Sequence, residues 1–445
     1  MGGSDDNALF VAHIEELQRR YDTALESAKL DAVLIAAGRP AEIFQDDQYL
    51  PFKSNPNLLQ WGPLTHHPDA ILSYRRGKTP ELLVYAPPDY WHRATPIPSL
   101  IEQAPINVRT VSDGIDLYKH AKTLPRRTAF IGEIRTPEDS FGLQRVNPTK
   151  LLDHLHKLRS VKTPWEVACI REANHIAVTG HKAAEACFDA GGCEYDIHLA
   201  FRAACKITDA EMPYPAIVAL NEHSATLHYQ HLNRAPGINL SLLIDAGCMV
   251  NGYASDITRT YTASPDFGAI IEAMHELQLK LCTAAQAGTD FRDLHRTAHH
   301  AIAGLMQETG IIVCAADQAV EHGLTRVFFP HGLGHFLGLQ VHDVGALLSS
   351  TKEDSDADPY LRLTRILEPG NVLTIEPGLY FIESLLTPLR RKRAGKHVNW
   401  VRVNELQKFG GIRIEDNLHI TDSGNENLTR MAFVADQEAV RRPIK

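Results

Sequence analysis

Two aspartates in the segment LSLLIDAGCMVNGYASDITRTY have the spacing to share one metal-binding face. The dipeptide Asn251-Gly252 is typical of a two-residue β-hairpin turn, and strand-forming residues flank it. With that turn, Gly247 pairs with Asp256, and Asp245, two residues before Gly247, points to the same face. The carboxylates are then diagonal neighbours about 7–8 Å apart at the backbone, and Gly247 leaves the space between them open. Such carboxylates repel unless a cation lies between them; a solvated hairpin face carrying two acids is the alternative.

Three histidines follow in the segment FFPHGLGHFLGLQVHD, namely His331, His335 and His342. The i, i+4 spacing of the first two would suit a metal site on a helix, but Pro330 and the neighbouring glycines disfavour a helix. A zinc-peptidase HExxH helix would also need glutamate where Gly332 stands. The segment is therefore predicted to be a glycine-rich turn whose backbone can pack close to a ligand. Structural histidines are the alternative, although three of them among glycines favour a functional role.

Two glutamates stand at or near the ends of predicted strands further along the chain. Glu376 follows VLTI and Glu415 follows IRI, where a carboxylate is costly to bury without a partner; exposed strand ends are the alternative. With two aspartates and one histidine, they form an oxygen-rich set that suits manganese or cobalt better than a structural zinc. Four carboxylates match the charge of two divalent ions. Two ions about 3.5–4 Å apart can hold a bridging hydroxide as nucleophile, so these residues predict a dinuclear hydrolytic site.

The elements that must position these residues divide the chain into two parts. Residues 1–158 alternate helix and strand patterns, which predicts a smaller α/β domain. At the sequence TPWE a new helix begins, with Thr163 as N-cap and Glu166 completing a capping box. Residues 159–445 then mix helices with strand-like runs, which predicts a larger α+β domain. The basic run RRKR at 390–393 is interpreted as a solvated loop.

Composition narrows the class of protein. The chain has 445 residues with 44% hydrophobic and 22% charged, which excludes wholesale disorder. Its net charge of −9 argues against a nucleic-acid partner. No apolar run is long enough to cross a membrane, and the first ten residues do not resemble a secretory signal. Seven cysteines without a CxxC pair indicate reduced thiols, so a cytoplasmic location is expected.

The settings IDAG, SDITRT, HGLGH, TIEPG and IRIEDN resemble, in this order, the pita-bread metallopeptidases of family M24. That family includes methionine aminopeptidase, aminopeptidase P and prolidase. The segments VALNEHSATLHY, TIEPGLYFIESLL and FGGIRIEDN are most similar to prolidases, the Xaa-Pro dipeptidases. FQDDQYLPFK and DYWHR are similar to the bacterial branch that includes the organophosphorus acid anhydrolases. The resemblance covers nearly the whole chain.

This resemblance implies an α+β pita-bread (creatinase/aminopeptidase) catalytic domain preceded by a smaller α/β creatinase-like domain. It implies a homodimer with two divalent metal ions per subunit, manganese first, with cobalt or zinc as alternatives. The expected reaction is hydrolysis of dipeptides with C-terminal proline by a metal-bridging hydroxide. The metal ligands that the resemblance implies are Asp245, Asp256, His335, Glu376 and Glu415.

The resemblance also assigns roles around the metals. Asp256 would bridge both ions, as would Glu415, and Glu376 would be the proton shuttle. His228 matches the histidine near the scissile bond, and His342 matches the one that steadies the tetrahedral intermediate. Arginine suits carboxylate binding, and in prolidases the substrate carboxylate is held at the position of Arg362. The remaining pocket residues are Tyr214, His331, Arg413, Asp47 and Trp91. Asp47 and Trp91 would reach the partner subunit's active site.

Three other functions remain open at this point. Aminopeptidase P, which acts on longer X-Pro peptides, has the same fold. The long span between Glu376 and Glu415 and the segment LYFIESLL favour the dipeptidase. Hydrolysis of organophosphates is expected only as a side activity. A metal-free binding module of the same fold is disfavoured because all five ligand positions are intact. The expected partner is a small peptide, with neither nucleic acid nor membrane involved.

Overall fold

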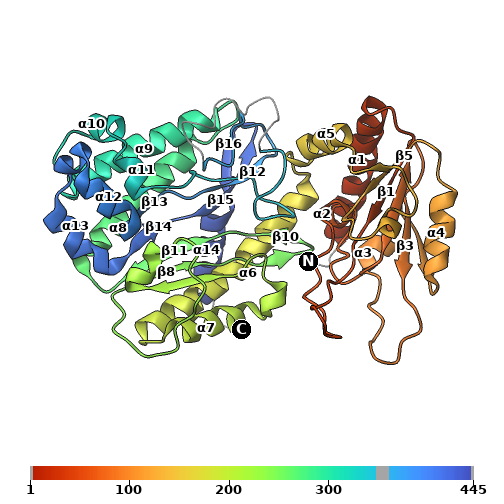
Figure 1. Cartoon of the computed structure of the whole chain (residues 1–445), viewed down its shortest axis with the longest axis horizontal. Coiled ribbons are helices and arrows are strands. Elements are labelled where there is room, and N and C mark those ends of the chain that lie inside the picture. Colours follow the sequence, from red (N-terminus) through yellow and green to blue (C-terminus); the bar gives the residue numbers. More distant parts are fainter. Residues whose placement is uncertain (1–3, 347–359, 442–445) are drawn as a thin grey trace. The chain divides into compact units, whose positions relative to one another are not determined.

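The structure is a computed structural model that describes residues 4–346 and 360–441, and it consists of two compact units (Figure 1). The N-terminal unit comprises Met1–Cys169 and Asn251–Tyr253, and the second unit comprises Ile170–Val250 and Ala254–Lys445. Within the described ranges, no helix combines the length and the apolar character needed to cross a membrane.

A six-stranded mixed sheet forms the centre of the N-terminal unit, in the order β4-β3-β2-β1-β5-β6. Its strands are β1 (Ala32–Ala36), β2 (Ile71–Arg75), β3 (Glu81–Tyr85), β4 (Asn107–Val111), β5 (Thr128–Ile131) and β6 (Arg145–Val146). Only β2 runs antiparallel to its neighbours, so the other five strands end at one edge of the sheet. The alternation of strands and helices agrees with the predicted α/β class.

Helices pack around this sheet. They are α1 (Ser4–Ser27), α2 (Pro56–Leu59), α3 (Ser99–Glu102), α4 (Gly114–Lys122) and α5 (Thr149–Arg159), and α6 (Pro164–Asp189) begins in this unit. Helix α1 buries an apolar stripe, which includes Phe10, Leu17 and Tyr21. The predicted capping box is present at the start of α6, since Thr163 N lies 2.7 Å from Glu166 Oε2 and Glu166 N lies 3.4 Å from Thr163 Oγ1.

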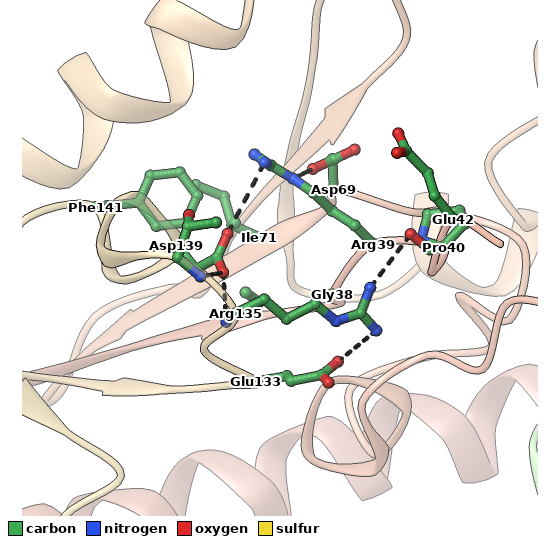
Figure 2. Close-up of a pocket in the computed structure, with 12 residues that line it drawn as sticks. Gly38, Arg39, Pro40, Glu42, Asp69, Ile71, Glu133, Arg135, Asp139 and Phe141 are labelled. Atoms are coloured by element: carbon green, nitrogen blue, oxygen red, sulfur yellow. Dashed lines mark hydrogen bonds and ion pairs between the residues drawn. The ribbon is translucent and has the colours of Figure 1, made fainter. Parts of the chain in front are cut away.

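A cavity of about 320 Å³ opens at the edge where β1 and β5 end (Figure 2). Its two arginines are already paired with carboxylates within the unit. Arg39 Nε lies 2.5 Å from Asp69 Oδ1, and Arg135 Nη2 lies 2.8 Å from Glu133 Oε2. Exposed ion pairs of this kind contribute only about 0–1 kcal/mol each to stability.

Short strands form several small sheets at the centre of the second unit. They are β7 (Ile217–Leu220), β8 (Ser241–Asp245), β9 (Met249–Val250), β10 (Tyr253–Ala254), β11 (Thr258–Thr262), β12 (Val372–Ile375), β13 (Gly378–Tyr380), β14 (Gly411–Arg413), β15 (Asp416–Thr421) and β16 (Gly424–Asn427). Strand orders are β11-β8-β7, β12-β15-β16, β13-β14 and β10-β9. This mixture of helices and mainly antiparallel strands agrees with the predicted α+β class.

Helices cover these strands (Figure 1). Two apolar cores lie within the unit. The helices are α7 (Glu194–Cys205), α8 (Pro265–Ala284), α9 (Phe291–Glu308), α10 (Ala316–Glu321), α11 (Thr325–Phe328), α12 (Glu383–Arg391), α13 (Trp400–Leu406) and α14 (Leu428–Arg441). Phe267 of α8 and Phe291 of α9 pack in one core with Leu373 of β12. Phe201 of α7 packs in the other core with Ile244 of β8. The acid-bearing strands are therefore held rigidly from the apolar side.

The prediction of a loop at the basic run 390–393 is wrong. The first two arginines end helix α12, and a 3₁₀ turn, Arg393–His397, follows. The helix forms because Leu386 and Leu389 bury one of its faces, while the Arg390 guanidinium lies 4.0 Å from the ring centre of Trp400. The four basic side chains are nevertheless exposed, as the solvated interpretation expected.

Candidate metal centre

The predicted hairpin places the first two acids. Asn251 and Gly252 have φ angles of +53° and +90°, as a type I′ turn requires. Asp245 pairs with Thr258 across β8 and β11, which is the register that the turn predicts. The expectation about Gly247 is wrong, because a Cβ there would lie 1.9 Å from the carbonyl oxygen of Ser255. That glycine allows the two hairpin strands to approach closely, and it leaves no open space.

A tyrosine joins the two aspartates. The Tyr214 hydroxyl oxygen lies 2.8 Å from Asp245 Oδ1 and 2.6 Å from Asp256 Oδ1. One hydroxyl proton cannot serve both carboxylates at once, so the buried pair is short of positive charge on this side. Arg413 compensates one of them, since its Nη2 donates to Asp245 Oδ2 at 2.6 Å. Asp256 faces the opposite way, toward the histidine segment.

The histidine segment is held by strand β12. Thr374 N donates to His335 O at 2.9 Å, and Glu376 N donates to Leu333 O at 2.8 Å. A Cβ at Gly334 would lie 2.0 Å from Thr374 O, so only glycine permits this contact. The segment is a turn rather than a helix, as predicted. At Gly334 its backbone packs closely against the backbone of β12.

The imidazole of His335 points toward the acids. Its Nδ1 lies 3.0 Å from Phe336 O, so Nδ1 carries the proton and Nε2 is left as an electron-pair donor. Nε2 lies 3.4 Å from Asp256 Oδ2 and 3.6 Å from Glu376 Oε1. This tautomer is the one that metal binding through Nε2 requires.

Ligand atoms of Asp256, His335 and Glu415 all lie within 4.8 Å of one another, and all three side chains are buried. Glu415 lies between β14 and β15, and its Oε2 accepts a hydrogen bond from Thr258 Oγ1 at 2.6 Å. Two carboxylates and one imidazole at this spacing fit a divalent metal ion. The other two predicted ligands, Asp245 and Glu376, contact this group through Tyr214 and His335.

Burial raises the pKa values of three acids of the cluster, whereas His335 and Tyr214 hold the pKa of Asp256 below its usual range. Burial raises the pKa of Glu376 to about 7, and burial together with the charge of Asp256 raises the pKa of Asp245 to about 6. Burial and the neighbouring carboxylates also raise the pKa of Glu415 well above its usual range. Without metal the cluster therefore holds protons at mildly acidic pH, and a metal ion must displace them.

We expect metal affinity to rise between pH 5 and pH 8, with protons released on binding. The pKa of Asp245 rises from 3.8 to about 6, and that of Glu376 from 4.5 to about 7. Protonation therefore stabilises the metal-free fold below about pH 4, and this contribution is lost as pH rises through 6–7. Titration calorimetry with Mn²⁺ in buffers of different ionisation enthalpy measures how many protons are released when the metal binds. Affinity that is constant across this range would contradict the expectation, and Glu376→Gln should release fewer protons.

The candidate ligands open into a cavity of about 840 Å³. It is lined by Asp245, Asp256, His335, Glu376 and Glu415, and also by His228, His331, His342, Arg362 and Arg413. His342 lies beside His335, with ring centres 4.4 Å apart. Burial and the positive charges nearby lower the pKa of His342 to about 4, so its imidazole is neutral at pH 7. The structure thus brings together every predicted site residue of the second unit except Tyr214, which contacts two of the acids without lining the cavity.

The two predicted site residues of the N-terminal unit are placed differently. Asp47 and Trp91 are exposed and lie outside helices and strands. The Trp91 side chain is 76% exposed, and its ring centre lies 4.9 Å from that of Tyr90. Their expected role at a partner subunit's active site stays a prediction.

Two residues that the sequence did not identify hold the cluster in place through hydrogen bonds. Tyr380 Oη lies 2.9 Å from His331 Nε2 and 3.0 Å from Arg413 Nη1, so it links two predicted pocket residues. Thr258 donates to Glu415, and the period of two along the segment DIT would have placed it on the face of Asp256. Tyr380 had no such local signal.

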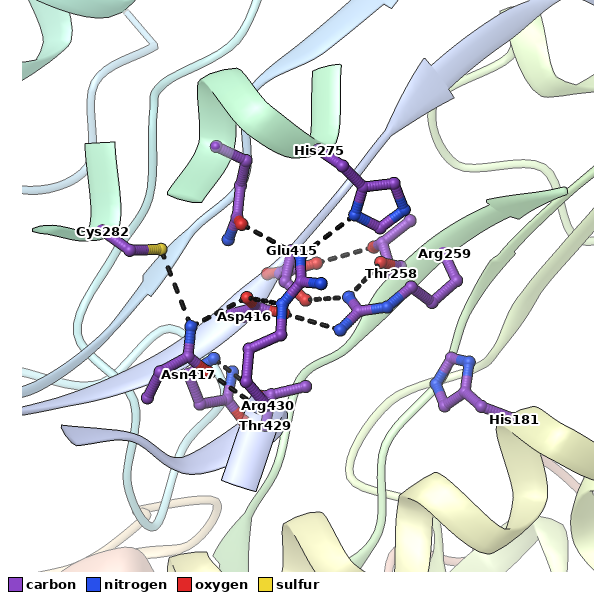
Figure 3. Close-up of polar contacts among 12 residues, drawn as sticks. His181, Thr258, Arg259, His275, Cys282, Glu415, Asp416, Asn417, Thr429 and Arg430 are labelled. Carbon is purple, nitrogen blue, oxygen red and sulfur yellow. Dashed lines mark hydrogen bonds and ion pairs between the residues drawn. The ribbon is translucent and has the colours of Figure 1, made fainter. Parts of the chain in front are cut away.

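A buried ion cluster lies directly behind Glu415 (Figure 3). Asp416 is fully buried and accepts from Arg259 Nη2 and Arg430 Nε, both at 2.7 Å. Arg259 Nη1 also donates to the carbonyl oxygens of Thr258 at 2.9 Å and Glu415 at 2.8 Å. This arginine therefore ties the main chain of the candidate metal ligand Glu415 to that of Thr258 in β11.

Comparisons with known proteins agree with this geometry. The chain matches the model of metallopeptidase family M24 over residues 168–422 and that of the Xaa-Pro dipeptidase N-terminal domain over residues 8–157. An Xaa-Pro dipeptidase of Yersinia pestis (strain Pestoides F) is 43% identical over 433 residues, which are 95% of this chain and 98% of the relative. An Xaa-Pro dipeptidase of Yersinia pseudotuberculosis serotype O:1b (strain IP 31758) matches to the same extent, 43% over 433 residues.

Solved structures of Escherichia coli aminopeptidase P share the fold. The low-pH form has a TM-score of 0.73 at 24% identity, with 96% of this chain and 99% of that chain covered. The zinc-substituted form in complex with product has a TM-score of 0.71 at 24% identity, with 95% and 98% covered. The fold and the acid–histidine cluster thus define a metallopeptidase of two-domain pita-bread architecture, as predicted. The chain belongs to metallopeptidase family M24.

Proposed function

We propose that this protein is an Xaa-Pro dipeptidase that works with two divalent metal ions, manganese in the first place. The observation that carries the proposal is the convergence of Asp256, His335 and Glu415 in a cavity that also contains Arg362. The 43% identity to Xaa-Pro dipeptidases over nearly both full chains supports the dipeptide substrate. Asp245 and Glu376 would complete the proposed ligand set with Asp256, His335 and Glu415.

The residues of the cavity suit the demands of this substrate. An Xaa-Pro bond is a tertiary amide without an N–H, so its leaving nitrogen must be protonated. When bound, the metal ions would supply an activated water nucleophile and polarise the scissile carbonyl. Glu376, whose pKa burial raises to about 7, can hold and deliver a proton near neutral pH. His342 is neutral at pH 7 and can donate a hydrogen bond to the carbonyl oxygen, and His228, which lines the same cavity, would lie near the scissile bond.

Arg362 explains a preference for dipeptides. Its side chain is exposed in the cavity, and a guanidinium can bind a carboxylate through two parallel hydrogen bonds. A C-terminal carboxylate in this position would seat a dipeptide across the metal ligands. A longer peptide has an uncharged amide there, so it would lose this contact.

A substrate panel tests the function and the role of Arg362. The manganese-loaded enzyme is expected to hydrolyse Ala-Pro at least about 10-fold more efficiently than a tripeptide that begins with Ala-Pro, because the tripeptide lacks a carboxylate at that position and loses one charge-assisted contact. Ala-Ala keeps the carboxylate, so its hydrolysis tests the requirement for proline. Arg362→Ala should raise KM for Ala-Pro and leave the slow cleavage of Ala-Pro-amide nearly unchanged. Equal losses for both would refute the carboxylate role, and preference for the tripeptide would favour an aminopeptidase.

We further propose a cytoplasmic homodimer, with Asp47 and Trp91 reaching the partner subunit's cavity. All seven cysteines are free, which supports a reducing compartment. Domain boundaries near residue 158 would separate a creatinase-like domain, 1–158, from the catalytic domain, 159–445. Organophosphate hydrolysis would be a side activity, because the same metals can polarise a phosphoryl oxygen.

A further inference from the structure

The chain that carries His228 has no regular secondary structure. It follows η3 (Asn221–Ala225) and continues to β8 without a helix or strand. His228 is exposed where this segment lines the cavity. A long connection of this kind costs conformational entropy to order, so hydrogen bonds from outside the segment must fix it.

Glu194, the first residue of helix α7, supplies those hydrogen bonds. Its side chain is fully buried, and it accepts four hydrogen bonds from the chain before and after His228. Oε1 accepts from Leu220 N at 2.9 Å and His223 Nδ1 at 2.7 Å. Oε2 accepts from Tyr229 Oη at 2.8 Å and Asn233 N at 2.7 Å. One carboxylate thus ties the two sides of His228 together.

The place of Glu194 in the fold suits a side chain that only accepts hydrogen bonds. It stands in the first turn of α7, where the unpaired N–H groups of a helix attract negative charge. Two of its donors belong to His223 and Tyr229, and the rings of these residues stack with centres 4.7 Å apart and an interplanar angle of 17°. Since four donors use the acceptor positions of a carboxylate, a neutral amide could not replace it without turning an NH₂ group toward another donor.

We propose that Glu194 is a positioning residue for peptide hydrolysis: it fixes the main chain on both sides of His228 and so holds that imidazole in the cavity. Glu194 is absent from the residues that line the cavity, so it acts through the loop. The inference rests on the proposed function, in which His228 faces the scissile bond. It adds a requirement outside the metal ligands, namely that the loop be held by a carboxylate of α7.

A double-mutant cycle with His228 tests this role. Glu194→Gln is expected to lower kcat/KM for Ala-Pro by about 10- to 100-fold, because misplacing a reacting group by about 1 Å costs up to about 10². Tyr229→Phe removes one of the four hydrogen bonds at constant shape and should lower it about 3-fold, which keeps the test usable if Glu194→Gln folds poorly. In a His228→Ala background, both substitutions should have almost no further effect. Equal fold-losses in both backgrounds would overturn the proposal.

Matched measurements separate positioning from a general loss of structure. Glu166 is also a fully buried carboxylate that accepts hydrogen bonds, but it belongs to the N-terminal unit, so Glu166→Gln should show no coupling with His228→Ala. Bound manganese should be unchanged in Glu194→Gln. Loss of manganese in that variant would assign its effect to the metal centre and contradict the proposal.

Hydrogen exchange provides a readout without substrate. Amides of residues 221–233 should exchange at least about 10-fold faster in Glu194→Gln than in the wild-type protein, with helices α8 and α9 unchanged. Unchanged exchange in the loop would refute the positioning role, even in an active enzyme. Faster exchange in a protein that hydrolyses no Xaa-Pro dipeptide would instead refute the proposed function and leave the tie between Glu194 and the loop standing.

Discussion

Replacing His335 with alanine is expected to lower kcat/KM for Ala-Pro by at least about 10³-fold, together with a loss of bound metal. The imidazole is the one nitrogen donor in the cluster with Asp256 and Glu415, and its Nε2 faces both Asp256 and Glu376. Without the His335 imidazole, the neighbouring carboxylates repel one another and the cation has one ligand fewer. Metal ions stabilise transition-state charge by several kcal/mol, and about 1.4 kcal/mol corresponds to a factor of ten.

Steady-state kinetics and elemental analysis of the same preparation measure both effects. His120→Gln is the matched control, because His120 is also buried and hydrogen-bonded, at 2.8 Å to Ser73 Oγ, but lies in the N-terminal unit. It should keep its metal and nearly all of its activity. Full metal content in His335→Ala, with activity within tenfold of the wild type, would mean that this histidine is no ligand.

Replacing Asp416 with alanine is expected to lower the free energy of unfolding by about 3–5 kcal/mol. The change would leave the guanidinium groups of Arg259 and Arg430 without the carboxylate that both bind at 2.7 Å. Burial alone would raise the pKa of Asp416, but the charges of the two arginines and hydrogen bonds from Arg430 and Asn427 hold it well below the usual range. Because the folded-state pKa is depressed, this contribution is present at neutral pH and is lost only in strong acid.

Urea unfolding at pH 7 with manganese present measures the loss. Asp422→Ala is the control, since Asp422 is exposed in the turn between β15 and β16 and its removal should change little. We also expect Asp416→Ala to weaken metal binding, because Arg259 would no longer be held against the carbonyl of Glu415. Equal stability of the two variants would show that the ion cluster does not hold the fold.

Local signals in the sequence predicted much of this architecture. The Asn251-Gly252 turn and the period of two fixed the hairpin register, and the Thr163–Glu166 capping box marked the start of a helix. Glycines around His335 correctly excluded a helix. All of these depend on residues close together in the chain, where backbone geometry alone decides the outcome.

Contacts between distant segments could not be predicted in the same way. Asp416 meets Arg259 from 157 positions away, and Glu194 meets Asn233 from 39 positions away. Neither pair has a spacing that signals the contact. The loop predicted at 390–393 is wrong for a related reason, because the core that buries Leu386 and Leu389 forms only in the folded protein.

The hydrogen bond from His335 Nδ1 to Phe336 O has a consequence for how this site tolerates change. The acceptor is a main-chain carbonyl of the next residue, and His331 makes the same kind of contact with Gly332 O at 2.8 Å. Every amino acid offers that carbonyl, so no side-chain substitution at 336 can remove it. The orientation and tautomer of the nitrogen donor are thus encoded in the path of the backbone. Attempts to alter metal preference by mutation would have to act on the carboxylates or on the glycines that shape that path.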